Sequence, residues 1–207
     1  MGKSERIIKI LQRRYKIKIL RGKPFRVLIG CIISKRTKDT NSWPVTNRLF
    51  RIANTPQKML TLPTQRLEKI IYSSGFYKQK AEEIKRTCKI LVEEYGDNVP
   101  ETREELMKLP GIGGKCADIV LSYAYGKYVI AVDTHVAKIA QRLLWTRHKQ
   151  PEKIREDLHR IIQGRERLKV NLMFVQFGRE ICTPVPKCHS CPIEKFCPYP
   201  KKTPKKL

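Results

Sequence analysis

Four cysteines lie close together near the C-terminal end of the chain and could bind one inorganic centre. They are Cys182, Cys188, Cys191 and Cys197, spaced C-x5-C-x2-C-x5-C in a proline-rich segment. A set of four thiolates can hold zinc or an iron–sulfur cluster. Structural zinc usually takes two short ligand pairs, and only Cys188 and Cys191 form such a pair here. The spacing therefore favours a cuboidal [4Fe–4S] cluster, with zinc and disulfides as the alternatives.

The other cysteines argue against a disulfide framework. The chain has seven cysteines, an odd number, and Cys31, Cys88 and Cys116 lie far from the four in apolar or helical sequence. We expect these three to be core thiols. Charged residues interrupt the first turns of the chain, and the apolar run 27–33 is too short to span a bilayer. We therefore expect an intracellular protein without a membrane segment, in the cytoplasm or nucleoid of a prokaryote.

The charge of the chain indicates a polyanionic partner. The 207 residues include 44 Lys and Arg against 19 Asp and Glu, a formal net charge of +25. An excess of this size is typical of proteins that bind nucleic acid. An anionic membrane surface is less suited, because the basic residues are spread over many segments instead of one amphipathic stretch. Charge alone predicts contacts with phosphates and no reading of bases.

A glycine-rich turn could supply such a phosphate contact. Pro110 would end one helix, and Gly111 and Gly113 permit positive φ on either side of Ile112, which can enter the core. The backbone N–H groups of the turn would then meet the N-terminus of the next helix and form a site for one phosphate. This is the pattern of a helix–hairpin–helix motif. The alternative is an ordinary corner between two helices with a glycine cap.

Two residues near this turn could carry out chemistry on a sugar. Lys115 follows the turn by two residues, and Asp133 lies eighteen residues further on, in the run VDTHV. Asp133 or Thr134 could simply cap a helix. A carboxylate at the mouth of a basic groove can also stabilise a sugar oxocarbenium ion.

The elements that must position these residues are helical. Apolar residues recur at helical spacing, with no alternating strand pattern and no internal repeat, so we predict an all-α fold. Thr102 and Glu105 form a capping-box pattern. The predicted helices cover residues 7–20, followed by a turn at 21–24, then 25–34, 81–95 ending at Gly96, a short helix from Thr102 that ends before Pro110, and 136–144.

Nearly the whole chain, from about residue 7 to 200, resembles the endonuclease III branch of the helix–hairpin–helix DNA glycosylases. The resemblance lies in PFRVLIGCIISKRTKDT, SGFYKQKAEEI, LPGIGGKCADIVLSYAYGKYVIAVDTHVAKIAQRL and the cysteine run. It implies two helical lobes with a DNA groove between them, and a monomer. One lobe, 20–128, would carry the helix–hairpin–helix motif. The other, 1–19 plus 129–207, would carry a [4Fe–4S] loop.

The resemblance also assigns roles to residues. Lys115 matches the Schiff-base lysine of the family and Asp133 its catalytic aspartate, while Gly111 and Gly113 lie in the DNA-gripping hairpin. Arg36 stands where the family commonly has a glutamine that fills the gap left by the extruded base. Phe76 stands where a second wedge residue, often leucine, enters the duplex. The cluster ligands correspond to Cys182, Cys188, Cys191 and Cys197, although the first cysteine interval is one residue shorter than usual.

The resemblance implies a bifunctional DNA glycosylase and abasic-site lyase that acts on double-stranded DNA with damaged bases, especially oxidised pyrimidines, or abasic sites. One alternative is a monofunctional thymine or uracil mismatch glycosylase. Enzymes of that kind usually lack the lysine, so Lys115 argues against it. Another alternative is a DNA-binding module without catalysis, and the presence of both Lys115 and Asp133 argues against that.

Overall fold

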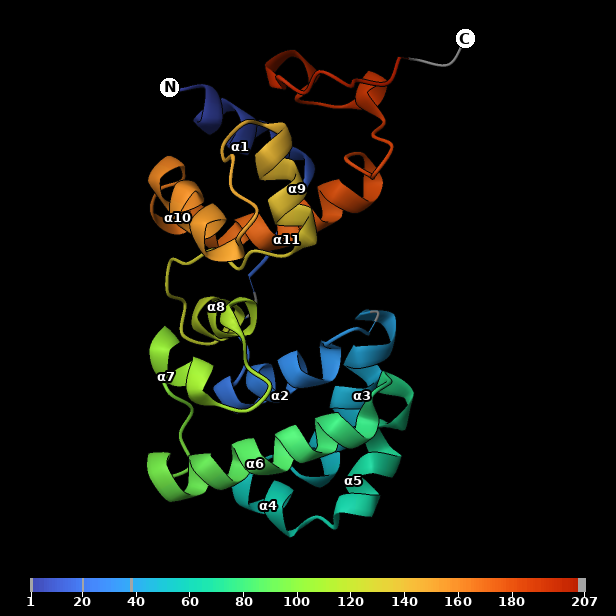
Figure 1. The fold of residues 1–207 in the computed structure, drawn as a ribbon, viewed down its shortest axis with the longest axis vertical. Helices are drawn as coiled ribbons and strands as arrows, with labels where there is room; N and C mark the ends of the chain where they lie inside the picture. The colour runs from blue at the N-terminus through green and yellow to red at the C-terminus, as the bar shows by residue number, and fades with distance from the viewer. Residues whose placement is uncertain (1, 20, 38, 205–207) are drawn as a thin grey trace. The chain divides into compact units, whose positions relative to one another are not determined.

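The chain forms helices, as the sequence predicts. The computed structural model describes residues 2–19, 21–37 and 39–204, and these contain no strand. Contacts divide the chain into two compact units, Arg21–Gly126 and Met1–Leu20 with Lys127–Leu207 (Figure 1). The all-α class is confirmed. The predicted lobe boundaries, after residues 19 and 128, remain a prediction.

The unit 21–126 is built around a long central helix, α6. Helices α4 and α5 pack against α6, while α2 packs against α3, α6 and α8. Its core includes the buried side chains of Leu28, Ile32, Leu49, Ile84 and Val120. The elements are α2 (Pro24–Ser34), α3 (Asp39–Ile52), α4 (Pro56–Thr61), α5 (Thr64–Ile71), the 3-10 turn η1 (Tyr72–Ser74), α6 (Tyr77–Tyr95), α7 (Arg103–Lys108) and α8 (Gly114–Tyr123).

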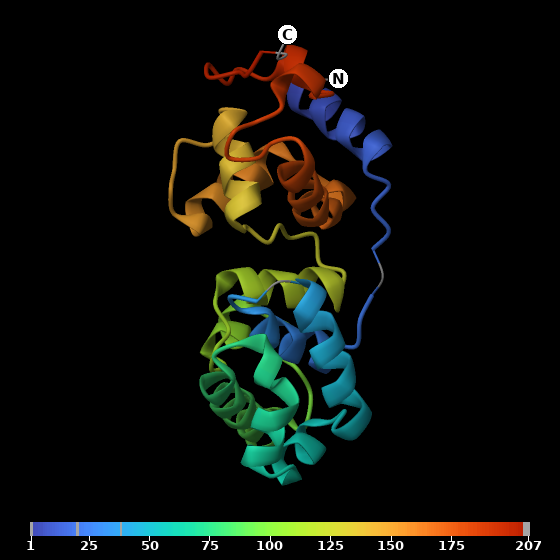
Figure 2. The same cartoon turned by 90° about the vertical axis from the view of Figure 1, so that its right-hand side faces the viewer.

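The second unit joins the N-terminal helix to the C-terminal part of the chain. Helix α11 packs against α9 and α1, so the two ends of the sequence share one core that includes Leu11, Ile139, Phe174 and Phe177 (Figure 2). The elements are α1 (Lys3–Arg14), α9 (Thr134–Arg142), α10 (Pro151–Ile161), η2 (Gly164–Glu166), α11 (Arg167–Glu180), η3 (Cys188–Ser190) and η4 (Glu194–Phe196).

Several helix ends follow the local signals in the sequence. Helix α6 ends where Gly96 adopts the left-handed conformation, with φ 53°, which glycine adopts without steric cost. Thr102 caps α7 by accepting a hydrogen bond from the backbone N–H of Glu105 at 3.3 Å. Helix α2 begins at Pro24, a favourable first residue because it needs no N–H partner there.

Two predicted helices extend too far toward the C-terminus. The first ends at Arg14, because Tyr15 leaves the helical conformation and directs its hydroxyl to the carboxylate of Glu180 at 2.7 Å. Ile17 therefore lies beyond the helix. The helix expected over 136–144 ends at Arg142, and Leu144 adopts a left-handed φ of 54° with 66% of its surface exposed. Apolar residues therefore continue at helical spacing beyond the last residue of both helices.

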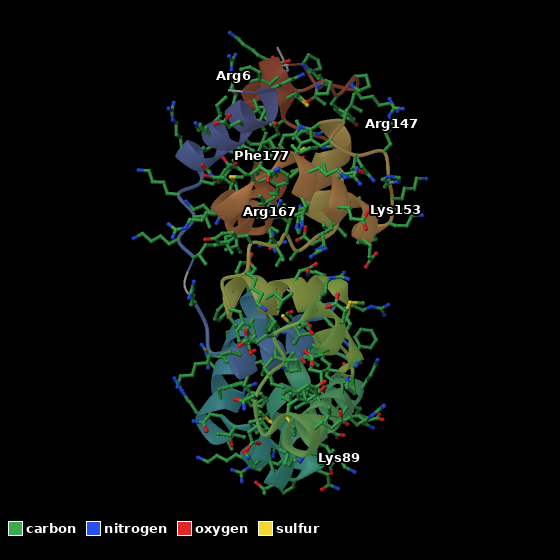
Figure 3. The ribbon with its side chains drawn as sticks, turned by 90° about the vertical axis from the view of Figure 1, so that its left-hand side faces the viewer. Arg6, Lys89, Arg147, Lys153, Arg167 and Phe177 are labelled. Atoms are coloured by element: carbon green, nitrogen blue, oxygen red, sulfur yellow. The ribbon has the colours of Figure 1, made fainter. Side chains whose placement is uncertain are left out.

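Basic side chains project outward from both units, as Arg6, Lys89, Arg147 and Lys153 illustrate (Figure 3). Within the described residues, every helix is too short or too polar to cross a membrane.

Candidate active site and cysteine centre

In the turn between α7 and α8, Ile112 enters the core as predicted, and the two glycines have different backbone conformations. Ile112 is buried, with 5% of its surface exposed. Gly111 has a φ of +78°, as expected. Gly113 is extended, with a φ of −98°, and is the N-cap of α8. Gly113 therefore does not use the positive φ that glycine permits, because a helix N-cap takes extended backbone.

Contacts from distant parts of the unit hold the two helices of this hairpin. Arg103 in the first position of α7 forms an ion pair with Asp118 in α8, with Nε and Oδ1 3.3 Å apart and Asp118 buried. Thr87 of α6 donates its hydroxyl hydrogen to the carbonyl of Pro110 at 3.0 Å. These contacts fix the angle at which the turn presents its backbone.

A lysine–glutamate pair closes over Gly111. The Lys35 Nζ lies 2.6 Å from the Glu83 carboxylate and 3.4 Å from the Gly111 carbonyl oxygen. A Cβ atom at Gly111 would stand 2.6 Å from Oε2 of Glu83. Glycine suits this position because it adopts the positive φ without steric cost, and a Cβ would also displace the end of the Glu83 side chain.

Lys115 is the second residue of α8, and its side chain is exposed. The next residue, Cys116, forms a thiol pair with the buried Cys31 of α2. The hydrogen bond from Cys31 and the charge of Lys115 lower the pKa of Cys116, while the same bond and burial raise the pKa of Cys31. Cys31 and Cys88 are core thiols as predicted, but Cys116 is partly exposed, so that part of the prediction is wrong.

Asp133 begins helix α9 in the other unit. It is half-buried, and its Oδ1 accepts a hydrogen bond from the backbone N–H of Val136 at 2.8 Å. The capping role that the sequence left open is therefore present. Lys115 and Asp133 belong to different units, so the structure defines the surroundings of each one separately.

The extended segment before Asp133 is held by two polar side chains that sequence reasoning did not identify. His159 of α10 accepts the backbone N–H of Ile130 at its Nε2, 3.1 Å away. The buried Asn171 of α11 donates to the carbonyl of Ala131 at 2.9 Å. These bonds satisfy backbone groups of a segment outside any helix and fix the point at which α9 begins.

The structure brings the two expected wedge residues together. Arg36 and Phe76 both have left-handed backbones, with φ 52° and 49°. The Arg36 guanidinium lies 5.4 Å from the centroid of the Phe76 ring, a cation–π distance. Both side chains are exposed, 58% in the case of Phe76. Left-handed backbone at residues other than glycine is costly and concentrates at functional sites.

The four C-terminal cysteines line one cavity. Cys182, Cys188, Cys191 and Cys197 all border it and are all partly exposed. Burial raises the pKa of Cys191 to about 11 and also raises the pKa of Cys197. Among the described residues, no three His, Cys, Asp or Glu side chains converge on a single metal-ion position. The donor set fits a cluster, because each thiolate of a cuboidal cluster binds a different iron atom.

Arg142, the last residue of α9, connects that helix to the cysteine loop. Its guanidinium donates to the sulfur of Cys182 at 3.1 Å and to the carbonyls of Thr183 and Pro184 at 2.7 and 2.8 Å. It also lies 4.7 Å from the centroid of the Tyr199 ring. This role has no signal in the sequence, since one arginine among so many basic residues is not distinctive.

Comparison with known proteins agrees with this geometry. Residues 29–163 match the model of the HhH-GPD superfamily base excision DNA repair proteins. Endonuclease III of Thermotoga maritima is 42% identical over 177 residues, covering 85% of this chain and 83% of that protein. The chain belongs to the endonuclease III family. Family membership makes it a DNA glycosylase and abasic-site lyase of base excision repair.

Solved structures of the family superpose closely on this chain. A non-covalent endonuclease III–DNA complex gives a TM-score of 0.87 at 33% identity and covers 96% of each chain. A trapped covalent endonuclease III–DNA intermediate gives a TM-score of 0.86 at 34% identity, with 96% of this chain and 97% of the other covered. The resemblance seen in the sequence thus extends to the tertiary structure.

Proposed function

We propose that the enzyme removes damaged pyrimidines, chiefly oxidised ones, from double-stranded DNA and then breaks the strand, with Lys115 as the nucleophile and Asp133 as its partner. The observation that carries this assignment is the position of Lys115. It is an exposed lysine in the first turn of α8, directly after the glycine-rich turn that we expect to bind a phosphate. A trapped covalent endonuclease III–DNA intermediate, 34% identical to this chain, supports a covalent route.

The reaction requires the damaged nucleotide to leave the base stack. The amine of Lys115 attacks C1′, the bond from C1′ to the base breaks, and the base departs with its bonding electrons and a proton. Asp133 stabilises the positive charge that develops on the sugar and accepts the proton lost by the amine. Asp133 passes that proton to O4′ as the C1′–O4′ bond breaks and the sugar ring opens, while a proton from solvent neutralises the departing base. The products are the free base and a lysine Schiff base in its iminium form.

Strand cleavage follows from the Schiff base. The iminium acidifies the proton on C2′, and its removal expels the 3′ phosphate as the C3′–O bond breaks. Water then releases Lys115 from the unsaturated sugar. The turn residues Gly111 and Gly113 bind the DNA backbone, while Arg36 and Phe76 fill the space left by the extruded base.

We assign a [4Fe–4S] cluster to Cys182, Cys188, Cys191 and Cys197, each thiolate holding one iron. The support is that all four thiols line one cavity, and four cysteine thiolates are the ligand set of a cuboidal cluster. The bound cluster would supply the covalent cross-links of a segment that has only the short turns η3 and η4. We further propose that the enzyme acts as a monomer on the DNA of a prokaryotic nucleoid.

Borohydride trapping on DNA with an abasic site tests the proposal, because borohydride reduces a Schiff base to a stable covalent link. Wild type should be captured and Lys115→Gln should not. Lys108→Gln, at another exposed lysine beside the same turn, is the matched control and should still be captured. On parallel duplexes that carry an oxidised pyrimidine or a thymine or uracil mismatch, base release without capture of wild type would indicate the monofunctional alternative. DNA binding without base release would indicate a binding module.

A further inference from the structure

Lys80 is a lysine whose side chain is almost fully buried, with 2% of its surface exposed. It is the fourth residue of α6. A buried charge is costly unless its donors are satisfied. The ammonium of Lys80 donates to the carbonyl of Ile33 at 2.7 Å, the hydroxyl of Thr37 at 2.9 Å and the carbonyl of Ser74 at 2.7 Å. Each of its three N–H groups therefore has an acceptor.

These acceptors come from the two turns that carry the wedge residues. Ile33 and Thr37 lie on either side of Arg36, in what we call the Arg36 turn (residues 33–37). Ser74 belongs to the Phe76 turn (residues 72–76). The hydroxyl of Thr37 also donates to the carbonyl of Ser74. One ammonium thus connects two turns that are separated by more than thirty residues of sequence.

The hydrogen bonds of Lys80 support the backbone next to Arg36 and Phe76, the two residues with strained φ angles. Arg36 and Phe76 both keep left-handed φ angles, and such angles persist only where surrounding contacts determine the backbone. Their side chains face solvent and contact each other at 5.4 Å. The Lys80 ammonium is a contact that reaches both turns from the interior of the unit.

We propose that Lys80 is a positioning residue for lesion recognition, which fixes the Arg36 turn and the Phe76 turn so that both side chains enter the duplex together. This inference rests on the proposed function, since it takes Arg36 and Phe76 as the residues that fill the gap. It adds a residue that touches neither DNA nor the reacting atoms and acts through the backbone of both turns.

The protonation state of Lys80 agrees with this role. Burial, reinforced by the charge of Lys35, lowers the pKa of Lys80 to about 8, while the carboxylate of Glu83 opposes the shift. The amine is therefore predominantly protonated at neutral pH, and it keeps the three N–H donors that the three acceptors require.

The same helix offers a matched control in Lys85. Its ammonium donates to the carbonyl of Leu60 at 2.7 Å and to the carbonyl of Leu62. These acceptors lie at the end of α4, in a segment with no proposed DNA contact. Lys80→Met and Lys85→Met therefore remove the same chemical group from α6, and only Lys80→Met releases the wedge turns.

The experiment compares binding to an undamaged duplex and to a duplex with a stable abasic-site analogue opposite 2-aminopurine. Displacement of 2-aminopurine from the stack changes its fluorescence and reports entry of the wedge residues. Lys80→Met should lower the preference for the abasic duplex by about tenfold or more, since misplaced groups lose productive geometry. It should also reduce the fluorescence change. Lys85→Met should match wild type in both measurements.

A second variant covers the case in which Lys80→Met does not fold. Thr37→Val removes one acceptor and the link to Ser74, and it should shift selectivity and fluorescence in the same direction by a smaller factor. A folded Lys80→Met, or failing that Thr37→Val, with the selectivity and fluorescence of wild type would overturn the inference. Borohydride capture of wild type is measured in parallel. If capture fails, the proposed function falls, whereas capture with unchanged selectivity rejects only the role of Lys80.

Discussion

The Oδ1 atom of Asp133 accepts the backbone N–H of Val136 at 2.8 Å, so the proposed catalytic carboxylate is also the N-cap of α9. A carboxylate has a second oxygen and several acceptor positions, so this bond is compatible with a role in the reaction. Capping in addition fixes the direction in which the carboxylate points. The two roles can be separated by a substitution that keeps one and removes the other.

Asp133→Asn should keep the fold and lose base excision. Asparagine caps helices about as well as aspartate, so the free energy of unfolding should change by less than about 1 kcal/mol. The negative charge that stabilises a cationic transition state is lost, so single-turnover excision should fall by a factor on the order of 10² or more. Excision within a few-fold of wild type would show that Asp133 serves only as a cap.

Alanine should lower the free energy of unfolding when it replaces Gly111 and should leave it nearly unchanged when it replaces Gly113. Gly111→Ala places a Cβ at positive φ and 2.6 Å from the Glu83 carboxylate, so it should cost about 1–3 kcal/mol of unfolding free energy. Gly113 is extended, and a Cβ there meets nothing within 4 Å. Gly113→Ala should therefore stay within about 1 kcal/mol of wild type in urea denaturation.

The same Gly113→Ala variant should bind DNA less tightly. Its methyl group would stand at the N-terminus of α8, where a phosphate would approach the backbone. Fluorescence anisotropy should show weaker binding to damaged and undamaged duplex alike, because a phosphate site reads no base. Equal affinity of Gly113→Ala and wild type at moderate salt would remove this turn from the DNA interface.

The cysteine centre predicts a coloured protein. Wild type purified without air should absorb broadly in the visible range and contain about four irons per chain. Cys191→Ala should lose the colour. It should also make the segment that carries the four cysteines, residues 182–197, less resistant to proteolysis. Cys88→Ala, at a buried cysteine outside the four, should keep the colour. Colourless wild type with one zinc per chain would reject the cluster.

The buried acceptor His159 should make stability depend on pH. Burial, together with the charges of Arg155 and Arg167, lowers the pKa of His159 from 6.5 to about 4. Between these values the unfolded chain binds a proton that the folded chain does not. The stabilisation is therefore complete above pH 6.5 and is lost progressively as the pH falls towards 4. The neutral ring is also the form that can accept the N–H of Ile130.

Urea denaturation at pH 7.5 and pH 5 would measure this effect. Titration of His159 should lower the free energy of unfolding of wild type by on the order of 1–2 kcal/mol between pH 7.5 and pH 5. His159→Gln retains an acceptor oxygen without a titrating group, so its loss over the same interval should be smaller. Identical pH dependence in wild type and His159→Gln would show that His159 does not contribute.

The features that the sequence determined by itself depend on residues close together in the chain. The left-handed stop at Gly96, the cap at Thr102 and the core contact of Ile112 follow from local backbone preferences. The spacing of the four cysteines lies within one short segment, and the positions of Lys115 and Asp133 follow from motifs that flank them. Such signals are local because turns, caps and ligand loops form among neighbouring residues.

Only the tertiary structure decided which side chains hold these motifs in place. Lys80, His159, Asn171 and Arg142 act on backbone groups that lie far away in sequence. Every residue except proline offers the same carbonyl and N–H groups, so nothing in the sequence marks which ones will be reached. A lysine is ordinarily a surface residue, and the sequence does not distinguish it from a lysine that becomes buried among carbonyl groups. Long-range packing, rather than local preference, therefore positions these motifs within each unit.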